Sequence, residues 1–143
     1  MKNRKGFSLL ELLIVVAIIL IIATIAIPSL LRSRQAANES SAVGNMRNLN
    51  TAQVSYSSTN GVYGAISDLI AARLLDDRYQ NPNFNGYRYT VVLSSASRNY
   101  SAFATGVASS TSKYDYYTSP DFVIRYSTAS SRAPNGMAGD PVQ

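Results

Sequence analysis

A long, mostly apolar run near the start of the chain is followed by a periodic pattern of apolar and polar residues. From Leu12 to Ile27 every residue is apolar except Thr24, and the run counted from Phe7 is 21 residues long. At about 1.5 Å per residue, a helix of this length spans about 31 Å, which is close to the thickness of one bilayer hydrocarbon core. Residues 7–27 are therefore predicted to form a membrane-spanning helix.

The helical pattern continues beyond Pro28 and becomes amphipathic. Proline lacks an N–H and clashes with the preceding turn, so Pro28 is expected to kink or loosen the helix, the alternative being that it only marks the membrane exit. Apolar side chains then recur at helical spacing, with Gln53 on the same face: Ala42, Val43, Met46, Leu49, Ala52 and Tyr56. This pattern predicts that residues 28–60 continue the helix and pack on a soluble domain, with binding of a partner as the alternative. Asn60-Gly61 is a natural stop.

Residues 61–143 are predicted to form a globular head. A short helix is expected over 67–75, with Ser67 or a neighbour as its cap. Alternating, β-branched and aromatic residues predict three strands, over 87–93, 101–107 and 122–126. Residues 109–120 are predicted to be a polar connection, and the tail from 130 onward to be irregular.

Three short antiparallel strands need an apolar cover to be stable, and the stripe on the second half of the helix supplies one. The predicted fold class is therefore α+β. It consists of a long N-terminal helix, membrane-spanning in its first half and amphipathic in its second, packed on a small antiparallel β-sheet head.

Composition narrows the chemistry that the chain can perform. It contains neither His nor Cys, which excludes disulfides, thiolate nucleophiles and the commonest catalytic triads. The aspartates do not occur at the spacing of a metal loop or a catalytic carboxylate pair. We therefore predict no enzyme activity, cofactor or metal, although a calcium ion shared by Asp115, Asp121 and Asp140 stays open as an alternative.

The basic balance of the chain comes partly from its first residues. The net charge is +5, and Lys2, Arg4 and Lys5 account for three of the 13 basic residues, which leaves 10 against 8 acidic. This N-terminal cluster favours a cytoplasmic N-terminus with the rest of the chain translocated. The remaining basic residues are scattered along the sequence, so they do not predict a nucleic-acid-binding face.

One carboxylate, Glu11, lies near the start of the apolar run. A charge in a membrane helix costs from a few to roughly 10 kcal/mol, so such a residue is a functional candidate. An ordinary uncleaved signal anchor explains the apolar run and its basic flank. It does not explain Glu11.

The segment that contains this carboxylate reads Gly6-Phe7-Ser8-Leu9-Leu10-Glu11, and with the apolar residues that follow it resembles the type IV prepilin signature. The resemblance implies that a membrane-embedded prepilin peptidase cleaves between Gly6 and Phe7, which removes leader residues 1–6. It also implies N-methylation of the new Phe7 amine. That amine would meet the Glu11 of a neighbouring subunit, and a pair within one chain stays open.

The resemblance further implies a structural subunit of a type IV pilus, with a precursor in the inner membrane and a mature form in an extracellular filament. The implied partners are copies of the chain in a helical homo-oligomer, the assembly ATPase and the platform protein. Helices of the family can partly unwind near the position of Pro28. The task of the pilus, whether adhesion, twitching motility, DNA uptake or secretion, stays open.

Other functions remain as alternatives to a major pilin. One is a type II secretion pseudopilin or a minor pilin. Another is a DNA-binding competence pilin, because arginines and tyrosines together bind single strands; the basic candidates are Arg73, Arg78, Arg88, Arg98 and Lys113. A third is electron conduction along stacked rings, with Phe7, Tyr56 and Tyr63 along the helix or just past it.

Overall fold

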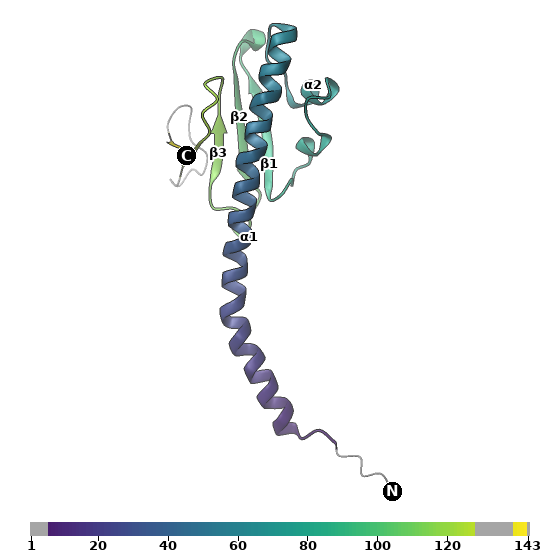
Figure 1. The fold of residues 1–143 in the computed structure, drawn as a ribbon, viewed down its shortest axis with the longest axis vertical. Coiled ribbons are helices and arrows are strands. Elements are labelled where there is room, and N and C mark those ends of the chain that lie inside the picture. Colours follow the sequence, from purple (N-terminus) through teal and green to yellow (C-terminus); the bar gives the residue numbers. More distant parts are fainter. Residues whose placement is uncertain (1–5, 128–138, 143) are drawn as a thin grey trace. The chain divides into compact units, whose positions relative to one another are not determined.

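The computed structural model describes residues 6–127 and 139–142 (Figure 1). The chain divides into two units, Met1–Ser33 and Arg34–Gln143, and each is described by itself. Helix α1, Leu9–Asn60, begins in the first unit and ends in the second. It ends at the predicted stop, where Gly61 adopts a positive φ of 72°.

The first unit contains the apolar part of α1. This helix is the one in the described residues that is long and apolar enough to cross a membrane. Pro28 lies inside the assigned helix, which continues across it. The Thr24 hydroxyl donates to the Leu20 carbonyl at 2.8 Å, so the one polar side chain in this part of the apolar run has its hydrogen-bond partner within the helix.

In its described residues, the second unit contains a five-stranded antiparallel sheet in the order β1-β2-β3-β4-β5, of which Figure 1 labels β1, β2 and β3. Its strands are β1 Tyr87–Leu93, β2 Tyr100–Gly106, β3 Asp115–Thr118, β4 Arg125–Ser127 and β5 Asp140–Pro141. Tyr87 pairs with Gly106 and Leu93 with Tyr100. The antiparallel α+β prediction is confirmed, and β1 has the predicted bounds.

The sheet has five strands where the sequence predicted three. Strand β3 lies within residues 109–120, which were predicted to be a polar connection. It was not predicted because all four of its residues are buried, so its sequence does not alternate between apolar and polar residues. The strand predicted over 122–126 is wrong in its first half, since Phe122 has a φ of 61° and β4 begins only at Arg125. The two residues of β5 are too few to give a pattern.

Two short helical elements connect α1 to the sheet. Helix α2 is Ile66–Ala71, shorter than the predicted 67–75, and its N-cap is Ala65, two residues before Ser67. The Asp68 carboxylate accepts the Ala65 N–H at 2.9 Å, so an acidic side chain within the first turn satisfies the helix start. The 3₁₀ helix η1, Asp77–Gln80, follows α2, and a further 3₁₀ helix, η2, Ser95–Ser97, lies between β1 and β2.

The core of the head forms between one face of α1 and the sheet. The predicted stripe is confirmed, with Tyr56 half-buried and the other large members fully or partly buried; the buried ones are Ala42, Met46, Leu49 and Ala52. Across from them the sheet contributes Tyr87, Tyr89, Tyr100, Ala102, Ala104 and Tyr116. Asn50 and Gln53 are buried in the same interface.

Both buried amides donate one hydrogen bond and accept one. The Asn50 amide donates to the Thr118 hydroxyl at 3.0 Å and accepts the Tyr100 hydroxyl at 2.9 Å. The Gln53 amide donates to the Gly64 carbonyl at 2.7 Å and accepts the Gly64 N–H at 3.0 Å. Because buried polar groups without partners are costly, these contacts hold α1 in one register against the head.

Candidate functional site

The predicted processing site lies just before the first turn of α1. Gly6 and Phe7 are exposed and outside any helix or strand, and the Phe7 side chain is 82% exposed. The Leu12 N–H donates to the Ser8 carbonyl at 3.2 Å, so the helix starts immediately after Ser8. The Gly6–Phe7 peptide bond is therefore in a non-helical, exposed segment.

Glu11 is in the first turn of α1, three residues after Ser8. A carboxylate near a helix N-terminus is favoured by the unpaired backbone N–H groups and the helix dipole. Ser8 and Glu11 also have the sequence spacing of a capping box. Within residues 6–127 and 139–142, neither ion pair involves Glu11.

The surface around Glu11 is apolar on every side of the helix. The large side chains from Leu9 to Ile27 are at least 45% exposed, for example Leu10 and Ile25 at 73% each. Soluble monomers rarely expose contiguous apolar surface beyond a few hundred Å². This segment therefore needs a cover from lipid or from other protein chains, and Glu11 lies within the surface to be covered.

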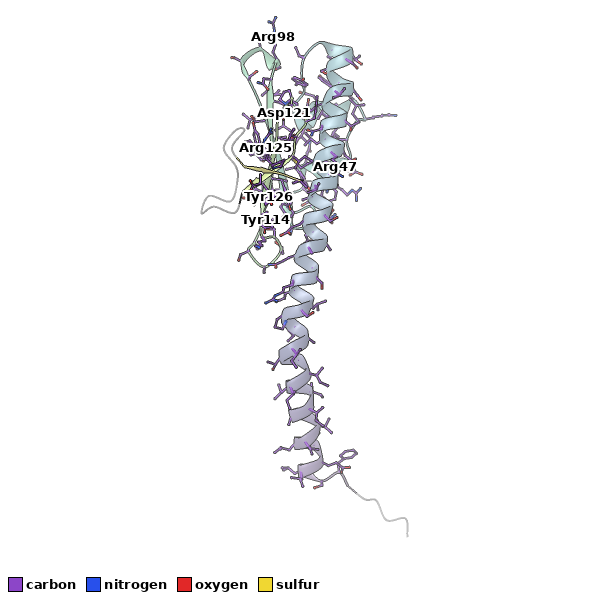
Figure 2. The ribbon with its side chains drawn as sticks, turned by 60° about the vertical axis from the view of Figure 1, so that its left-hand side comes forward. Arg47, Arg98, Tyr114, Asp121, Arg125 and Tyr126 are labelled. Carbon is purple, nitrogen blue, oxygen red and sulfur yellow. The ribbon has the colours of Figure 1, made fainter. Side chains whose placement is uncertain are left out.

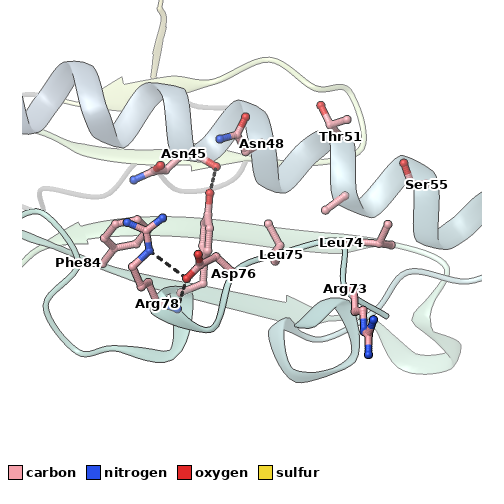
Figure 3. Close-up of a pocket in the computed structure, with 12 residues that line it drawn as sticks. Asn45, Asn48, Thr51, Ser55, Arg73, Leu74, Leu75, Asp76, Arg78 and Phe84 are labelled. Atoms are coloured by element: carbon pink, nitrogen blue, oxygen red, sulfur yellow. Dashed lines mark hydrogen bonds and ion pairs between the residues drawn. The ribbon is translucent and has the colours of Figure 1, made fainter. Parts of the chain in front are cut away.

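The head has an open cleft of about 450 Å³ beside α1, which we call the α1 cleft (Figure 3). One wall is the α1 face bearing Asn45, Asn48, Thr51 and Ser55, and the other is the segment from Arg73 to Phe84. The Asp76 carboxylate accepts the Arg78 N–H at 2.8 Å and its guanidinium at 2.9 Å. These bonds lower the pKa of Asp76 to about 2, and the negative charge of Asp76 is balanced by Arg78 in the same loop.

The three aspartates that could share a calcium ion, Asp115, Asp121 and Asp140, have different surroundings. Asp115 accepts the Gly106 N–H at 2.8 Å, Asp121 pairs with Arg125, and Asp140 is in β5. In the described ranges, no group of three acidic side chains is placed to hold a metal ion.

The basic residues of the DNA-binding alternative are divided among different surfaces. Arg73 and Arg78 line the α1 cleft, and the Arg78 guanidinium lies 5.0 Å from the Phe84 ring centre. Arg88 and Arg98 each line another hollow. The Lys113 ammonium lies over the Tyr114 ring. This arrangement lacks the single basic stripe that tracks a nucleic-acid backbone.

Aromatic contacts in the described part of the head form separate groups. Tyr79, Phe84 and Tyr89 contact one another with ring centres 5.1–5.8 Å apart, and the other contacts are pairs: Tyr63–Tyr100, Tyr87–Tyr116, Phe103–Tyr117 and Tyr114–Tyr126. Burial raises the pKa of Tyr89 to about 12 and that of Tyr87, Tyr100 and Tyr116 further. These phenols are neutral at physiological pH, and their rings pack in the hydrophobic core.

Comparison with known proteins gives a match for the N-terminal segment. Residues 1–27 match the family described as the prokaryotic N-terminal methylation motif. The chain is also similar to the type IV wide pilus major component PilA4 of Thermus thermophilus, with 59% identity over 39 residues, which is 27% of this chain and 30% of that protein.

Two further relatives extend the similarity into the head. The type IV major pilin protein PilA of Myxococcus xanthus is 42% identical over 68 residues, 48% of this chain and 31% of that protein. The type II secretion system core protein G of Vibrio cholerae is 33% identical over 88 residues, 62% of this chain and 59% of that protein. The chain thus spans between about a third and three fifths of the lengths of these relatives.

Proposed function

Since its N-terminal segment identifies the chain as a type IV pilin-family protein, we propose that it is a structural subunit of a type IV pilus. The observation that carries this proposal is the match of residues 1–27 to the methylation motif. The apolar side chains of the same segment are exposed in the single chain. Copies of the same helix provide a matching apolar cover. Bundled helices inside and heads outside then give a helical homo-oligomeric filament.

Processing and assembly are linked in this proposal. The precursor lies in the inner membrane with its basic residues in the cytoplasm, where prepilin peptidase cleaves after Gly6 and the Phe7 amine is methylated. The assembly ATPase and the platform protein then move subunits into the extracellular filament. The exposed, non-helical Gly6–Phe7 segment supports the cleavage step, because a protease needs an extended and accessible chain.

Glu11 has its partner in the Phe7 amine of a neighbouring subunit. An uncompensated charge in an apolar bundle is costly, and an opposite charge offsets that cost. Burial of each Leu or Ile side chain contributes about 1.5–3 kcal/mol, so apolar packing supplies most of the assembly free energy. The Glu11 pair then selects one register, and the amine is available only after cleavage.

A second candidate is a subunit of a type II secretion pseudopilus. The similarity to the Vibrio cholerae secretion protein favours it, because that match spans 88 residues and so extends beyond α1. Both candidates share the processing and bundling steps. They differ in whether the chain is abundant in surface filaments.

Mass spectrometry of filaments sheared from cells tests the proposal. A type IV pilus subunit is expected to be a major component of the sheared fraction, with its first residue an N-methylated Phe7. A mature chain that stays in the membrane fraction, with none in sheared filaments, would support the secretion candidate instead. An abundant chain that still carries residues 1–6 would contradict the processing step.

A further inference from the structure

The turn between β3 and β4 is held rigid around one carboxylate. Asp121 Oδ1 accepts the Ser119 hydroxyl at 2.9 Å and the Val123 N–H at 3.2 Å. Asp121 Oδ2 pairs with the Arg125 guanidinium at 2.6 Å; Figure 2 labels these two residues. Burial opposes the charge of Asp121, but the bonds from Arg125, Ser119 and Val123 outweigh it and lower the pKa of the carboxyl. The turn is therefore locked at neutral pH.

This turn presents Phe122 to solvent. The Phe122 side chain is 45% exposed, and its φ of 61° lies in the left-handed region that bulky residues rarely adopt. Its N–H donates to the Ser119 carbonyl at 2.8 Å. An exposed aromatic ring in a strained and fixed conformation adds little to the core. Such strain is concentrated at contact and functional sites.

At the β1 edge of the sheet there is a hollow of about 420 Å³, which we call the β1 hollow. Figure 1 shows α2 beside β1, with β3 on the other side of β2. The buried Tyr79 and Tyr89 form part of its lining, together with apolar groups of Ile66, Pro82 and Val91. Its volume is within the range of pockets that bind small ligands, so it can receive an aromatic side chain.

The rim of the β1 hollow suits an aromatic occupant. Arg88 and Thr90 are exposed there, and no ion pair of Arg88 is found in the part of the chain that the structure describes. A free guanidinium at a pocket mouth can stack on an incoming ring. The α1 cleft is a poorer receiver, because its wall of Asn45, Asn48 and Thr51 would lose hydration without gaining hydrogen bonds from a phenyl ring.

We propose that Phe122 of one subunit inserts into the β1 hollow of the next subunit in the filament. This inference rests on the proposed function, because bundled α1 helices are what bring two heads together. The ring is in the turn between β3 and β4 and its receiver is beside β1, so two different surfaces of the head meet and the contact is heterologous. Heterologous contacts that do not close into a ring propagate as a helix.

Disulfide cross-linking tests this contact cleanly, because the chain contains no Cys. The test variant is Phe122→Cys with Thr90→Cys, assembled in cells, oxidised and sheared, then analysed on a non-reducing gel. Each copy carries both halves of the contact, so we expect a ladder of covalent oligomers. Each single variant should stay monomeric, and a dimer alone would indicate an isologous contact and overturn the proposal.

Two matched double variants locate the receiver. Phe122→Cys with Thr51→Cys probes the α1 cleft, and Phe122→Cys with Val92→Cys probes an exposed β1 residue that does not line the hollow. We expect at least tenfold less ladder from either pair than from the Thr90 pair. An equal or stronger ladder from the Thr51 pair would overturn the proposal, and so would normal filaments without a ladder in any variant.

A second measurement uses the unmodified chain, so it does not depend on assembly of the variants. Hydroxyl-radical footprinting compares wild-type filaments with the detergent-solubilised subunit. We expect Phe122 to be oxidised at least fivefold more slowly in filaments, whereas equal oxidation would overturn the contact. Absence of the wild-type chain from filaments would instead contradict the proposed pilus function, so the two failures are distinguishable.

Discussion

Single residues decide how tightly the head is attached to α1. Gln53 is buried and exchanges two hydrogen bonds with Gly64, which lies just beyond the end of the helix. The sequence placed Gln53 on the apolar face of the helix. Its partner was not predictable, because the bonds require the chain to turn back after Gly61.

Replacing this amide by an acid is expected to make stability depend on pH. In Gln53→Glu the carboxylate faces the Gly64 carbonyl, so burial and repulsion raise its folded pKa above the unfolded value of about 4.3. Stability should match the wild type most closely below pH 4.3 and fall as the pH rises toward the folded pKa. At pH 7 we expect a loss of about 1–3 kcal/mol.

Thermal unfolding of the detergent-solubilised chain from pH 4 to pH 8 measures this effect. Gln53→Met, which has similar size and no charge, is the control. It should lose stability by an amount that does not change with pH. A pH-independent Gln53→Glu variant would show that the Gln53–Gly64 contact is absent.

Ala96 lies in the loop between β1 and β2 with a φ of 71°, which disfavours any residue with a Cβ. Ala96→Gly is therefore expected to raise the free energy of unfolding by about 0.5–1 kcal/mol. The same substitution at Ala37, an exposed position within α1, should lower it by about 0.8–1 kcal/mol. Equal signs for the two variants would contradict the loop conformation.

At the scale of elements, regular patterns were predictable and irregular ones were not. The long helix and β1 follow from their apolar run and alternation, and the prediction of α1 differs from the structure by two residues at its start. Strand β3 is buried on both faces and therefore lacks alternation. Phe122 has the composition of a strand residue, but its positive φ places it in a turn.

The same contrast applies to the candidate site. Gly6, Phe7 and Glu11 are recognisable because their spacing is local in the sequence. The β1 hollow combines residues from α2, η1 and β1, so only the folded head brings them together. Phe122 becomes informative only when its exposure and backbone conformation are known.

Gly86, the residue before β1, lies close to both α1 and the loop before β3. Its φ is +82°, and a Cβ there would lie 2.8 Å from the Asn38 amide nitrogen, which donates to the Thr111 carbonyl. Gly86→Ala is expected to cost about 2–3 kcal/mol, from backbone strain and loss of that hydrogen bond. Asn38→Ala should cost about 1 kcal/mol.

A double-mutant cycle by urea unfolding separates the two causes. Asn38→Ala removes the group that a Cβ at position 86 would displace, so the double variant should be about 1 kcal/mol more stable than the sum of the single changes predicts. Strict additivity would show that Asn38 does not contact the Gly86 backbone.

At the scale of the whole molecule, an apolar segment that contains one carboxylate, Glu11, precedes a head with its own hydrophobic core. The head can satisfy its buried amides and phenols alone, whereas the segment around Glu11 depends on other molecules. The proposed filament resolves this difference, because the same surface that holds the precursor in the membrane becomes the bundle interior after cleavage.

Glu11→Ala is expected to uncouple processing from assembly. The variant should still be inserted and cleaved after Gly6, but its filaments should be reduced at least tenfold, because the Phe7 amine loses its partner in an apolar bundle. Immunoblots of membrane and sheared fractions measure both steps. Leu10→Ala, a neighbouring apolar change, should retain most of the yield, and a normal yield from Glu11→Ala would contradict the register role.

The most direct measurement is a cryo-electron-microscopy structure of the native filament. Our account predicts α1 helices bundled at the filament axis, with the methylated Phe7 nitrogen within about 4 Å of a Glu11 carboxylate on another subunit. A filament in which this chain is present but Glu11 faces no amine, or in which α1 lies outside the core, would contradict the account.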